Sequence, residues 1–227
     1  MCGRYRLTDP AALRELAHRA PGIELPEGIL PRFNVAPSQA MPVIAAGPDG
    51  APRMMTMKWG YIPFWEKSAK PKLAPINAKS EEAFAKPMFQ QSIQQRRCLI
   101  PADGFYEWKT PERGGKQPFD IHLPGNRPFF LAGIYEKSTD IKPETFLIFT
   151  TRPNRLMERI HQRMPVILAD EATRSWITPG PVTSDQFTRL MVPYPPERME
   201  ALPITSLVNN PRNDNPAILA PSGPDQG

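Results

Sequence analysis

The residue with the clearest chemical potential is Cys2, which directly follows the initiator methionine. Because its side chain is small, we expect Met1 to be removed, which leaves Cys2 with a free α-amine beside its own thiol. Such a 1,2-aminothiol can form a Schiff base with an aldehyde and then close its thiol onto the same carbon as a thiazolidine. It can also catalyse acyl transfer, with the thiolate as nucleophile and the amine as base. A cysteine in this place can equally be incidental, so the rest of the chain has to decide.

Two aromatic stretches carry charged residues that suit nucleic-acid binding or proton transfer. Residues 59–65 (WGYIPFW) precede three lysines between positions 67 and 72. This combination is typical of a platform for unpaired bases, and equally of an aromatic cluster at the edge of a core. Glu107 stands between a tyrosine and a tryptophan in a predicted strand. We expect partial desolvation to favour its neutral, proton-donating form, although strand alternation also allows it to face water.

The composition narrows the class of protein. The 227 residues suit one globular domain with a substantial core, and lysine and arginine outnumber aspartate and glutamate by 28 to 23. That excess mildly favours a polyanionic partner. With only two cysteines, the chain is not a disulfide framework. The sequence contains no paired Cys-x-x-Cys, no His-Glu-x-x-His and no phosphate-binding glycine loop, so we expect no metal and no cofactor.

The elements that must position these groups are mainly strands joined as hairpins. Residues 41–46 and 52–58 flank a Gly-Pro-Asp-Gly turn, and residues 117–123 and 128–136 flank Pro-Gly-Asn, which predicts two hairpins. Since no regular βαβ alternation occurs, the sequence predicts an α+β fold with a mostly antiparallel sheet or barrel-like core and peripheral short helices. Those helices are expected after Thr8 or Asp9, from Ser80, and over 154–162, 170–176 and 183–191.

The chain divides into one domain and a tail. Residues 1–209 contain all the predicted elements, and no linker interrupts them. Residues 210–227 are rich in asparagine and proline with few large apolar side chains, so we expect them to leave the core and to be largely disordered. The start of the chain is polar and no run of about 18 apolar residues occurs, so we expect neither a signal peptide nor a membrane partner.

Four segments, in this order, resemble the SRAP family, the SOS-response-associated peptidases or abasic-site processing proteins. They are residues 1–5 (MCGRY), 76–81 (INAKSE), 104–108 (GFYEW) and 160–166 (IHQRMPV), and residues 33–37 (FNVAP) and 59–63 (WGYIP) fit as well. Each motif is weak alone, whereas their number and order make the resemblance specific over residues 1 to about 209.

The resemblance implies a sensor of abasic sites in single-stranded DNA. In this family the N-terminal cysteine forms a reversible thiazolidine with the ring-opened aldehyde of the abasic deoxyribose, and this link shields the lesion from strand cleavage. The implied fold is a sheet-rich α+β core with a basic channel for the strand. We therefore expect abasic single-stranded DNA as the partner, a monomeric protein, and a cytoplasmic location that becomes nucleoid-associated when DNA is bound.

Carried onto this chain, the resemblance assigns roles to single residues. Cys2 is the covalent residue, Asn77 positions its amine or the sugar, Glu107 moves protons, and His161 serves as acid or base at the sugar. The implied DNA-binding residues are Arg4, Asn34, Pro37, Trp65, Lys79, Trp108, Thr150 and Arg163. The family usually has arginine at position 79, and lysine there keeps the charge but loses the two-pronged fork.

Three other functions remain open from the residues alone. Glutamine amidotransferases can also begin Met-Cys-Gly, but they continue with an apolar residue and carry an Asn-Gly pair, whereas this chain has Arg4 and no Asn-Gly dipeptide. A thiol peptidase that acts on itself is a second alternative. The third is a non-covalent single-strand binder in which Cys2 is incidental.

Overall fold

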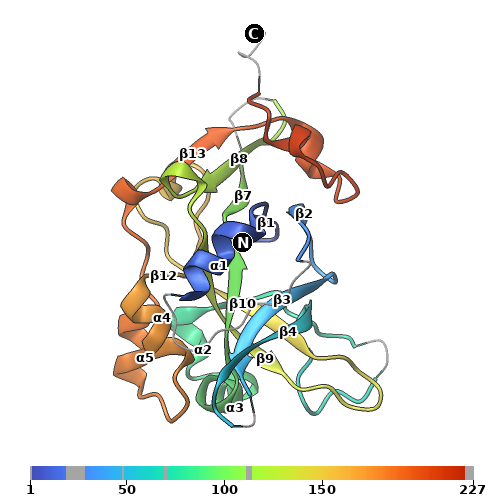
Figure 1. The fold of residues 1–227 in the computed structure, drawn as a ribbon, viewed down its shortest axis with the longest axis vertical. Coiled ribbons are helices and arrows are strands. Elements are labelled where there is room, and N and C mark those ends of the chain that lie inside the picture. Colours follow the sequence, from blue (N-terminus) through green and yellow to red (C-terminus); the bar gives the residue numbers. More distant parts are fainter. Residues whose placement is uncertain (1, 19–28, 48, 69–70, 111–113, 223–227) are drawn as a thin grey trace.

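The computed structural model describes residues 2–18, 29–47, 49–68, 71–110 and 114–222. It is a mixed α+β fold with two sheets and short helices around them (Figure 1), which confirms the predicted fold class. Most strand pairs are antiparallel; β10 pairs parallel with β4 and β5.

The larger sheet has eight strands, five of which close into a barrel. Seven strands lie in the order β11-β10-β4-β3-β6-β9-β12, and the eighth, β5, pairs with β10 off this path. An additional pairing between β9 and β10 joins the two ends of the run β10-β4-β3-β6-β9 and closes the barrel. The predicted hairpin of β3 and β4 is confirmed, with Ala46 opposite Pro52. The strands are β3 (Ala40–Ala46), β4 (Pro52–Trp59), β5 (Asn77–Lys79), β6 (Arg97–Ala102), β9 (Phe129–Glu136), β10 (Thr145–Thr151), β11 (Met164–Pro165) and β12 (Ile167–Leu168).

The smaller sheet has five strands and contains the start of the chain. Its order is β13-β8-β7-β1-β2, with β13 (Glu200–Pro203), β8 (Gln117–His122), β7 (Gly104–Lys109), β1 (Tyr5–Leu7) and β2 (Arg32–Val35). Strand β1 lies between β7 and β2, and Tyr5 pairs with Phe105. Because β1 begins only three residues after Cys2, this pairing fixes the N-terminal segment beside β7.

The second predicted hairpin is wrong, because its two strands belong to different sheets. Strand β8 pairs with β7 and β13, whereas β9 pairs with β6, β10 and β12. Between them, η1 (Pro124–Asn126) turns the chain through Gly125, whose φ of 70° favours glycine. The chain also changes sheets at Asp103. The buried Arg6 holds both points at which the chain passes from one sheet to the other. Its guanidinium donates to Asp103 Oδ1 at 2.6 Å and to Asn126 Oδ1 at 2.8 Å.

Helices cover the outer side of the barrel. They are α1 (Pro10–His18), α2 (Ser80–Ala83), α3 (Pro87–Gln95), α4 (Asp170–Ile177) and α5 (Ser184–Leu190). Asp9 caps α1, since its Oδ1 accepts the backbone N–H groups of Ala11 and Ala12 at 3.0 Å each. The helix predicted over 154–162 is reduced to the 3₁₀ turn η2 (Met157–Arg159), because the Asn154 side chain accepts the N–H of Met157 and closes a tighter turn.

The segment after residue 209 is folded as far as the structure describes it, which corrects the predicted tail. Asp214 lies 2.6 Å from Arg32 and accepts the backbone N–H of Asn34 at 2.9 Å. In η5 (Pro216–Leu219), Ile218 is fully buried and packs with Tyr106. The asparagines and prolines that resembled a disordered tail instead form caps and 3₁₀ turns. Residues 223–227 lie outside the described part of the chain.

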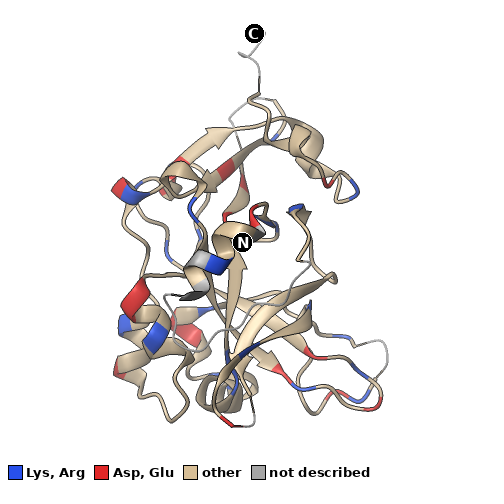
Figure 2. Cartoon of the chain, viewed as in Figure 1, with Lys and Arg blue, Asp and Glu red and all other residues tan. Residues whose placement is uncertain are grey.

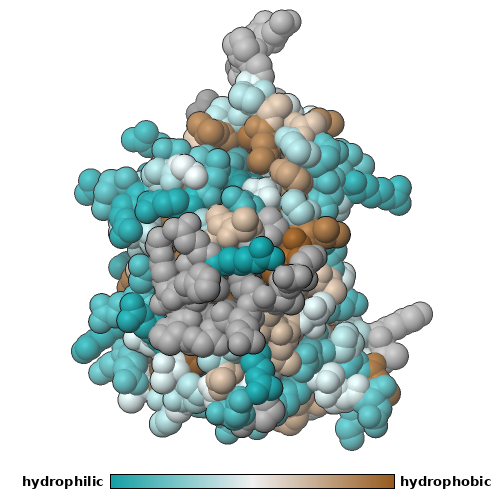
Figure 3. Space-filling view, viewed as in Figure 1, coloured by the Kyte–Doolittle hydropathy of each residue, from teal (hydrophilic) through white to brown (hydrophobic). Residues whose placement is uncertain are grey.

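The surface carries both signs of charge. Figure 2 shows acidic and basic residues side by side on the helices at the lower left and on the strand ends at the lower right. Apolar residues gather near the top of the space-filling view (Figure 3). Two leucines of the C-terminal part of the chain, Leu202 and Leu207, are about half exposed. None of the helices in the described residues is both long and apolar enough to cross a membrane.

Candidate active site

Cys2 lies where the two sheets meet. Its side chain is fully buried in a cluster that includes Tyr5 and Phe105 of the small sheet and Ile148 of the barrel. The thiol donates to the carbonyl of Arg4, with Sγ 3.8 Å from the oxygen. Burial raises the pKa of the Cys2 thiol, and the nearby carboxylate of Glu107 raises it further. The thiol is therefore protonated at neutral pH.

Asn77 holds Cys2 from the barrel side. It stands at the start of β5, where the parallel pairing with β10 places it opposite Ile148. Its Nδ2 donates to the Cys2 carbonyl at 2.8 Å. Its Oδ1 is buried and accepts no hydrogen bond from the residues that the structure describes. Asn77 thus anchors the backbone of Cys2 and offers one further acceptor to a group that enters the site.

Glu107 and His161 form an acid–base pair next to Cys2. The Glu107 side chain, on β7, is only 4% exposed, and its Oε1 lies 3.7 Å from Nδ1 of His161, which is 28% exposed. Burial raises the pKa of Glu107, and a protonated His161 would act in the opposite direction. Both residues line a cavity of about 560 Å³ together with Trp108, Thr110, Lys116 and Asn209.

Arg163 and Thr150 connect this pair to the barrel. The Arg163 guanidinium lies 2.7 Å from Glu81 Oε2 and donates to the Thr150 carbonyl at 2.6 Å. Thr150 is fully buried on β10, and its hydroxyl donates to the Ala78 carbonyl at 3.5 Å. Both terminal nitrogens of the Arg163 guanidinium are therefore already hydrogen-bonded to protein groups.

Arg4, Trp108 and Asn34 form a second group on the small sheet. Arg4 Nη1 donates to Asn34 Oδ1 at 2.8 Å and to the Val208 carbonyl at 2.7 Å, and its guanidinium lies 5.9 Å from the centre of the Trp108 ring. Trp108 Nε1 donates to Asn209 Oδ1 at 2.6 Å. Asn34 is buried, and its Nδ2 donates to the carbonyls of Val208, Asn210 and Asn213. The C-terminal segment thus orients both Arg4 and Trp108.

The remaining predicted DNA-binding residues lie at the surface. Trp65 is 48% exposed and packs edge-to-face on Phe64, with ring centres 4.9 Å apart. Lys79 is exposed and lies 3.6 Å from Glu82, and Pro37 is half-buried. In the part of the chain that the structure describes, no hydrogen bond or ion pair links these three residues to Cys2 or Glu107.

Three lining residues of the site cavity were missed by the sequence analysis. Thr110 directly follows β7, Lys116 directly precedes β8, and Asn209 ends η4 (Ser206–Asn209). Thr110 and Lys116 belong to no motif, so nothing in the sequence was a reason to select them. Asn209 carried a signal, since it is the last residue of the predicted domain.

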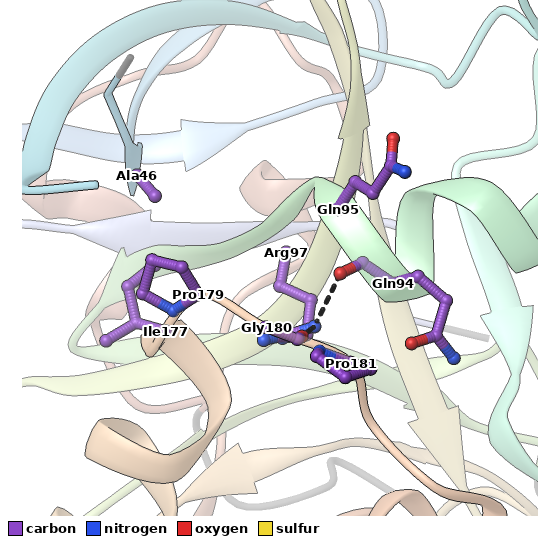
Figure 4. Close-up of a pocket in the computed structure, with 8 residues that line it drawn as sticks. All are labelled: Ala46, Gln94, Gln95, Arg97, Ile177, Pro179, Gly180 and Pro181. Carbon is purple, nitrogen blue, oxygen red and sulfur yellow. Dashed lines mark hydrogen bonds between the residues drawn. The ribbon is translucent and has the colours of Figure 1, made fainter. Parts of the chain in front are cut away.

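A separate pocket of about 400 Å³ lies between α3 and the segment after α4 (Figure 4). Its one charged lining residue, Arg97, is used structurally, because its guanidinium donates to the carbonyls of Trp176, Ile93 and Gly180. No cysteine, histidine or carboxylate lines it. The cavity beside Glu107 is therefore the stronger candidate for chemistry. The described residues contain no cluster of three or more histidine, cysteine or carboxylate side chains that could bind a metal ion.

Comparison with known proteins gives a consistent answer. Residues 1–211 match the family model described as SOS response associated peptidase (SRAP). The chain is 43% identical to the abasic site processing protein YoqW of Bacillus subtilis, over 86% of this chain and 88% of that protein. It is 30% identical to the abasic site processing protein HMCES of Gallus gallus, over 97% and 78% of the two chains. A crystal structure of a Bacteroides thetaiotaomicron protein matches with a TM-score of 0.82 and 26% identity, covering 97% of this chain and all of that one.

Proposed function

Because the chain belongs to the SOS response associated peptidase (SRAP) family, we propose that it processes abasic sites and traps them covalently in single-stranded DNA through Cys2. Relatives that are 43% and 30% identical carry the name abasic site processing protein, which supports this substrate. The observation that carries the proposal is the juxtaposition at the N-terminus. The backbone of Cys2 is anchored by Asn77, and the Cys2 thiol lies within electrostatic reach of the buried acid Glu107.

The reaction starts at the α-amine that removal of Met1 exposes. This amine attacks the aldehyde carbon of the ring-opened deoxyribose, and the resulting carbinolamine loses water to give a Schiff base. The thiol sulfur of Cys2 then adds to the same carbon as the C=N double bond becomes a single bond. The thiol proton is transferred to the nitrogen, which therefore carries one hydrogen in the thiazolidine ring. One water molecule is released in total and no oxidant or reductant is consumed, so hydrolysis reverses the link.

Glu107 transfers the protons in both steps. Its raised pKa makes the carboxylate a stronger base than an exposed one, and its neutral form protonates the hydroxyl that leaves as water. Because the Cys2 thiol is held protonated, the amine reacts first and the sulfur needs a base when it adds. Asn77 keeps Cys2 in place, and His161 acts as acid or base at the sugar.

The DNA strand is held by cations and rings around this centre. Arg4 and Lys79 contact phosphates, and Trp65 and Trp108 contact neighbouring bases. Arg163, which the resemblance assigns to a phosphate, has its guanidinium bound to Glu81 and Thr150 and so acts within the protein instead. Aromatic side chains stack on bases of any sequence, which suits a protein that has to find a missing base. Thr150 and Asn34, which the resemblance assigns to DNA contacts, are buried and bonded to protein groups, so they support the binding edge from behind. Pro37 belongs to the edge itself.

The decisive experiment mixes the protein with a labelled single strand that contains one abasic site and separates the products under denaturing conditions. We expect a stable adduct with the wild type and none with Cys2→Ala, which should retain salt-sensitive binding. Cys98→Ala is the matched control, since it removes the other buried cysteine and should leave the adduct intact. Full crosslinking by Cys2→Ala contradicts the proposal.

The same preparation tests the alternatives. A non-covalent binder would shift the strand in a native gel and leave no adduct under denaturing conditions. A glutamine amidotransferase would release ammonia from glutamine. For a thiol peptidase that removes its own Met1, mass spectrometry of Glu107→Gln would show Met1 retained, whereas removal by a separate aminopeptidase would leave the variant processed.

A further inference from the structure

Glu81 takes no part in the chemistry proposed above, yet its carboxylate holds a key side chain of the site. Its Oε1 accepts a hydrogen bond from Arg163 Nη1 at 2.8 Å, and its Oε2 accepts one from Nη2 at 2.7 Å. The two side chains therefore form a bidentate ion pair. The Oε1 atom also accepts the backbone N–H of Arg152 at 3.1 Å. Since Nη2 of Arg163 also donates to the Thr150 carbonyl, the guanidinium is fixed to both α2 and β10.

The backbone of Arg163 in turn controls the ring of His161. The Arg163 N–H donates to Nδ1 of His161 at 3.0 Å. The Arg163 carbonyl at 3.1 Å and Glu107 Oε1 at 3.7 Å lie near the same nitrogen. The backbone N–H of Arg163 always carries its hydrogen, so a hydrogen on Nδ1 of His161 would point at that hydrogen and repel it. An Nδ1 that accepts this N–H leaves the ring hydrogen on Nε2.

From these contacts we propose that Glu81 is a positioning residue, an inference that rests on the proposed function. Its ion pair with Arg163 fixes residues 161–163, and this holds His161 with its hydrogen on Nε2. The neutral imidazole then donates a hydrogen bond to an oxygen of the opened sugar, and Glu107 alone exchanges protons. This narrows the acid-or-base role of His161 to that of a hydrogen-bond donor.

Glu82 provides a matched control for Glu81. The two neighbours lie in the first turn of α2, and their side chains are 47% and 49% exposed. Glu82 pairs with Lys86 at 2.6 Å and with Lys79 at 3.6 Å, not with Arg163. Replacing either by glutamine removes the same surface charge, but only Glu81→Gln weakens the grip on Arg163.

The tautomer can be measured without DNA. The chain has three histidines, so long-range ¹H–¹⁵N spectra of labelled protein are simple to assign, with His161→Gln as the reference. We expect the Nε2–H tautomer in the wild type and in Glu82→Gln, and a mixture of tautomers in Glu81→Gln. A wild-type His161 with its hydrogen on Nδ1, or a Glu81→Gln spectrum identical to the wild type, overturns the proposal.

The crosslinking rate at saturating abasic DNA gives the second readout. We expect Glu81→Gln to be about tenfold slower, as for a small misplacement of a reacting group. Glu82→Gln should stay within about twofold, as expected for an exposed ion pair. His161→Gln keeps a donor and should be faster than His161→Ala; equal rates argue against the donor role. If the adduct depends on Cys2 but Glu81→Gln matches Glu82→Gln, this inference fails and the proposed function stands. If Cys2→Ala still crosslinks, the function fails, and the tautomer measurement still decides the role of Glu81.

Discussion

Two regions of the proposed DNA site are built in different ways. The reaction centre, meaning Cys2, Asn77, Glu107 and His161, is held by contacts from both sheets, and Cys2 and Glu107 are buried. The aromatic loop, represented by Trp65 and its neighbour Phe64, keeps 48% and 58% of these side chains exposed. The groups for bond formation are therefore preorganised, whereas the rings for base contact stand at the surface. Reaction rate and DNA affinity should therefore respond to different mutations.

Glu107→Gln should give the largest effect and should act on the rate alone. Loss of a positioned proton-transfer group slows a reaction by about 10²–10⁴-fold. We expect the crosslinking rate at saturating DNA to fall within this range, while DNA affinity stays near the wild-type value. The rate is measured from adduct formation over time, and the affinity from binding to an intact strand. A fall in affinity with an unchanged rate would make Glu107 a structural residue and would contradict its assignment to the reaction centre.

The same substitution should stabilise the fold at neutral pH. Burial raises the pKa of folded Glu107 above that of the unfolded chain, so its contribution to stability is fully present below the unfolded pKa and is lost as the pH rises through the folded pKa. Glutamine is neutral at every pH and avoids this loss. We expect Tm at pH 7 to rise, and the gain to shrink in acid. Thermal unfolding of both proteins across this pH range checks the sign.

Trp65→Ala should have the opposite signature to Glu107→Gln. Removing a ring that stacks on a base costs about 1–3 kcal/mol of binding energy, so affinity should fall about tenfold or more. The crosslinking rate at saturating DNA should not change, because the reaction centre is untouched. Ile141→Ala, which removes another exposed apolar side chain, is the control and should bind normally. A slower reaction at saturation would show that the aromatic loop also positions the lesion.

Asp214→Asn should test how far the C-terminal segment supports the reaction centre. The change weakens the ion pair with Arg32 and the bonds to the backbone N–H groups of Phe33 and Asn34, which should cost about 1–2 kcal/mol of stability. We expect a lower denaturant midpoint and an adduct rate that falls less than in Glu107→Gln. An unchanged midpoint would mean that the segment does not contribute to folding.

Lys79→Arg should give the smallest effect. Arginine restores the fork that suits a phosphate, at a position that is exposed and only loosely paired with Glu82. We expect affinity for single-stranded DNA to rise by about threefold or less, with the crosslinking rate unchanged. Lys86→Arg is the matched control, because Lys86 also pairs with Glu82. Weaker binding by Lys79→Arg would argue against a phosphate contact at this position.

Local signals in the sequence predicted several local elements correctly. The cap at Asp9, the hairpin of β3 and β4, and the final helix capped by Thr183 all depend on neighbouring residues. The two sheets could not be separated in this way. The hairpin expected around residues 124–126 fails because Arg6, more than 100 residues earlier, binds Asn126 and helps hold the crossing between sheets.

The site shows the same limit. The motif that contains Asn77 pointed to the Cys2 amine or the sugar, whereas the observed bond is to the Cys2 carbonyl, a contact between residues 75 positions apart. The pairing of Glu81 with Arg163 spans 82 positions and left no mark in composition or periodicity. The motifs predicted candidate residues for the site, but the partner of each residue depends on tertiary packing.

The enclosure of the Cys2 sulfur between the sheets also protects it against oxidation. Peroxides and disulfides react with exposed thiolates, and this thiol is both fully buried and kept protonated by its surroundings. The folded protein should therefore resist hydrogen peroxide and thiol-alkylating reagents at Cys2, and lose this resistance on unfolding, as peptide mass spectrometry would detect. The sulfur would in this way stay intact until an abasic site reaches it.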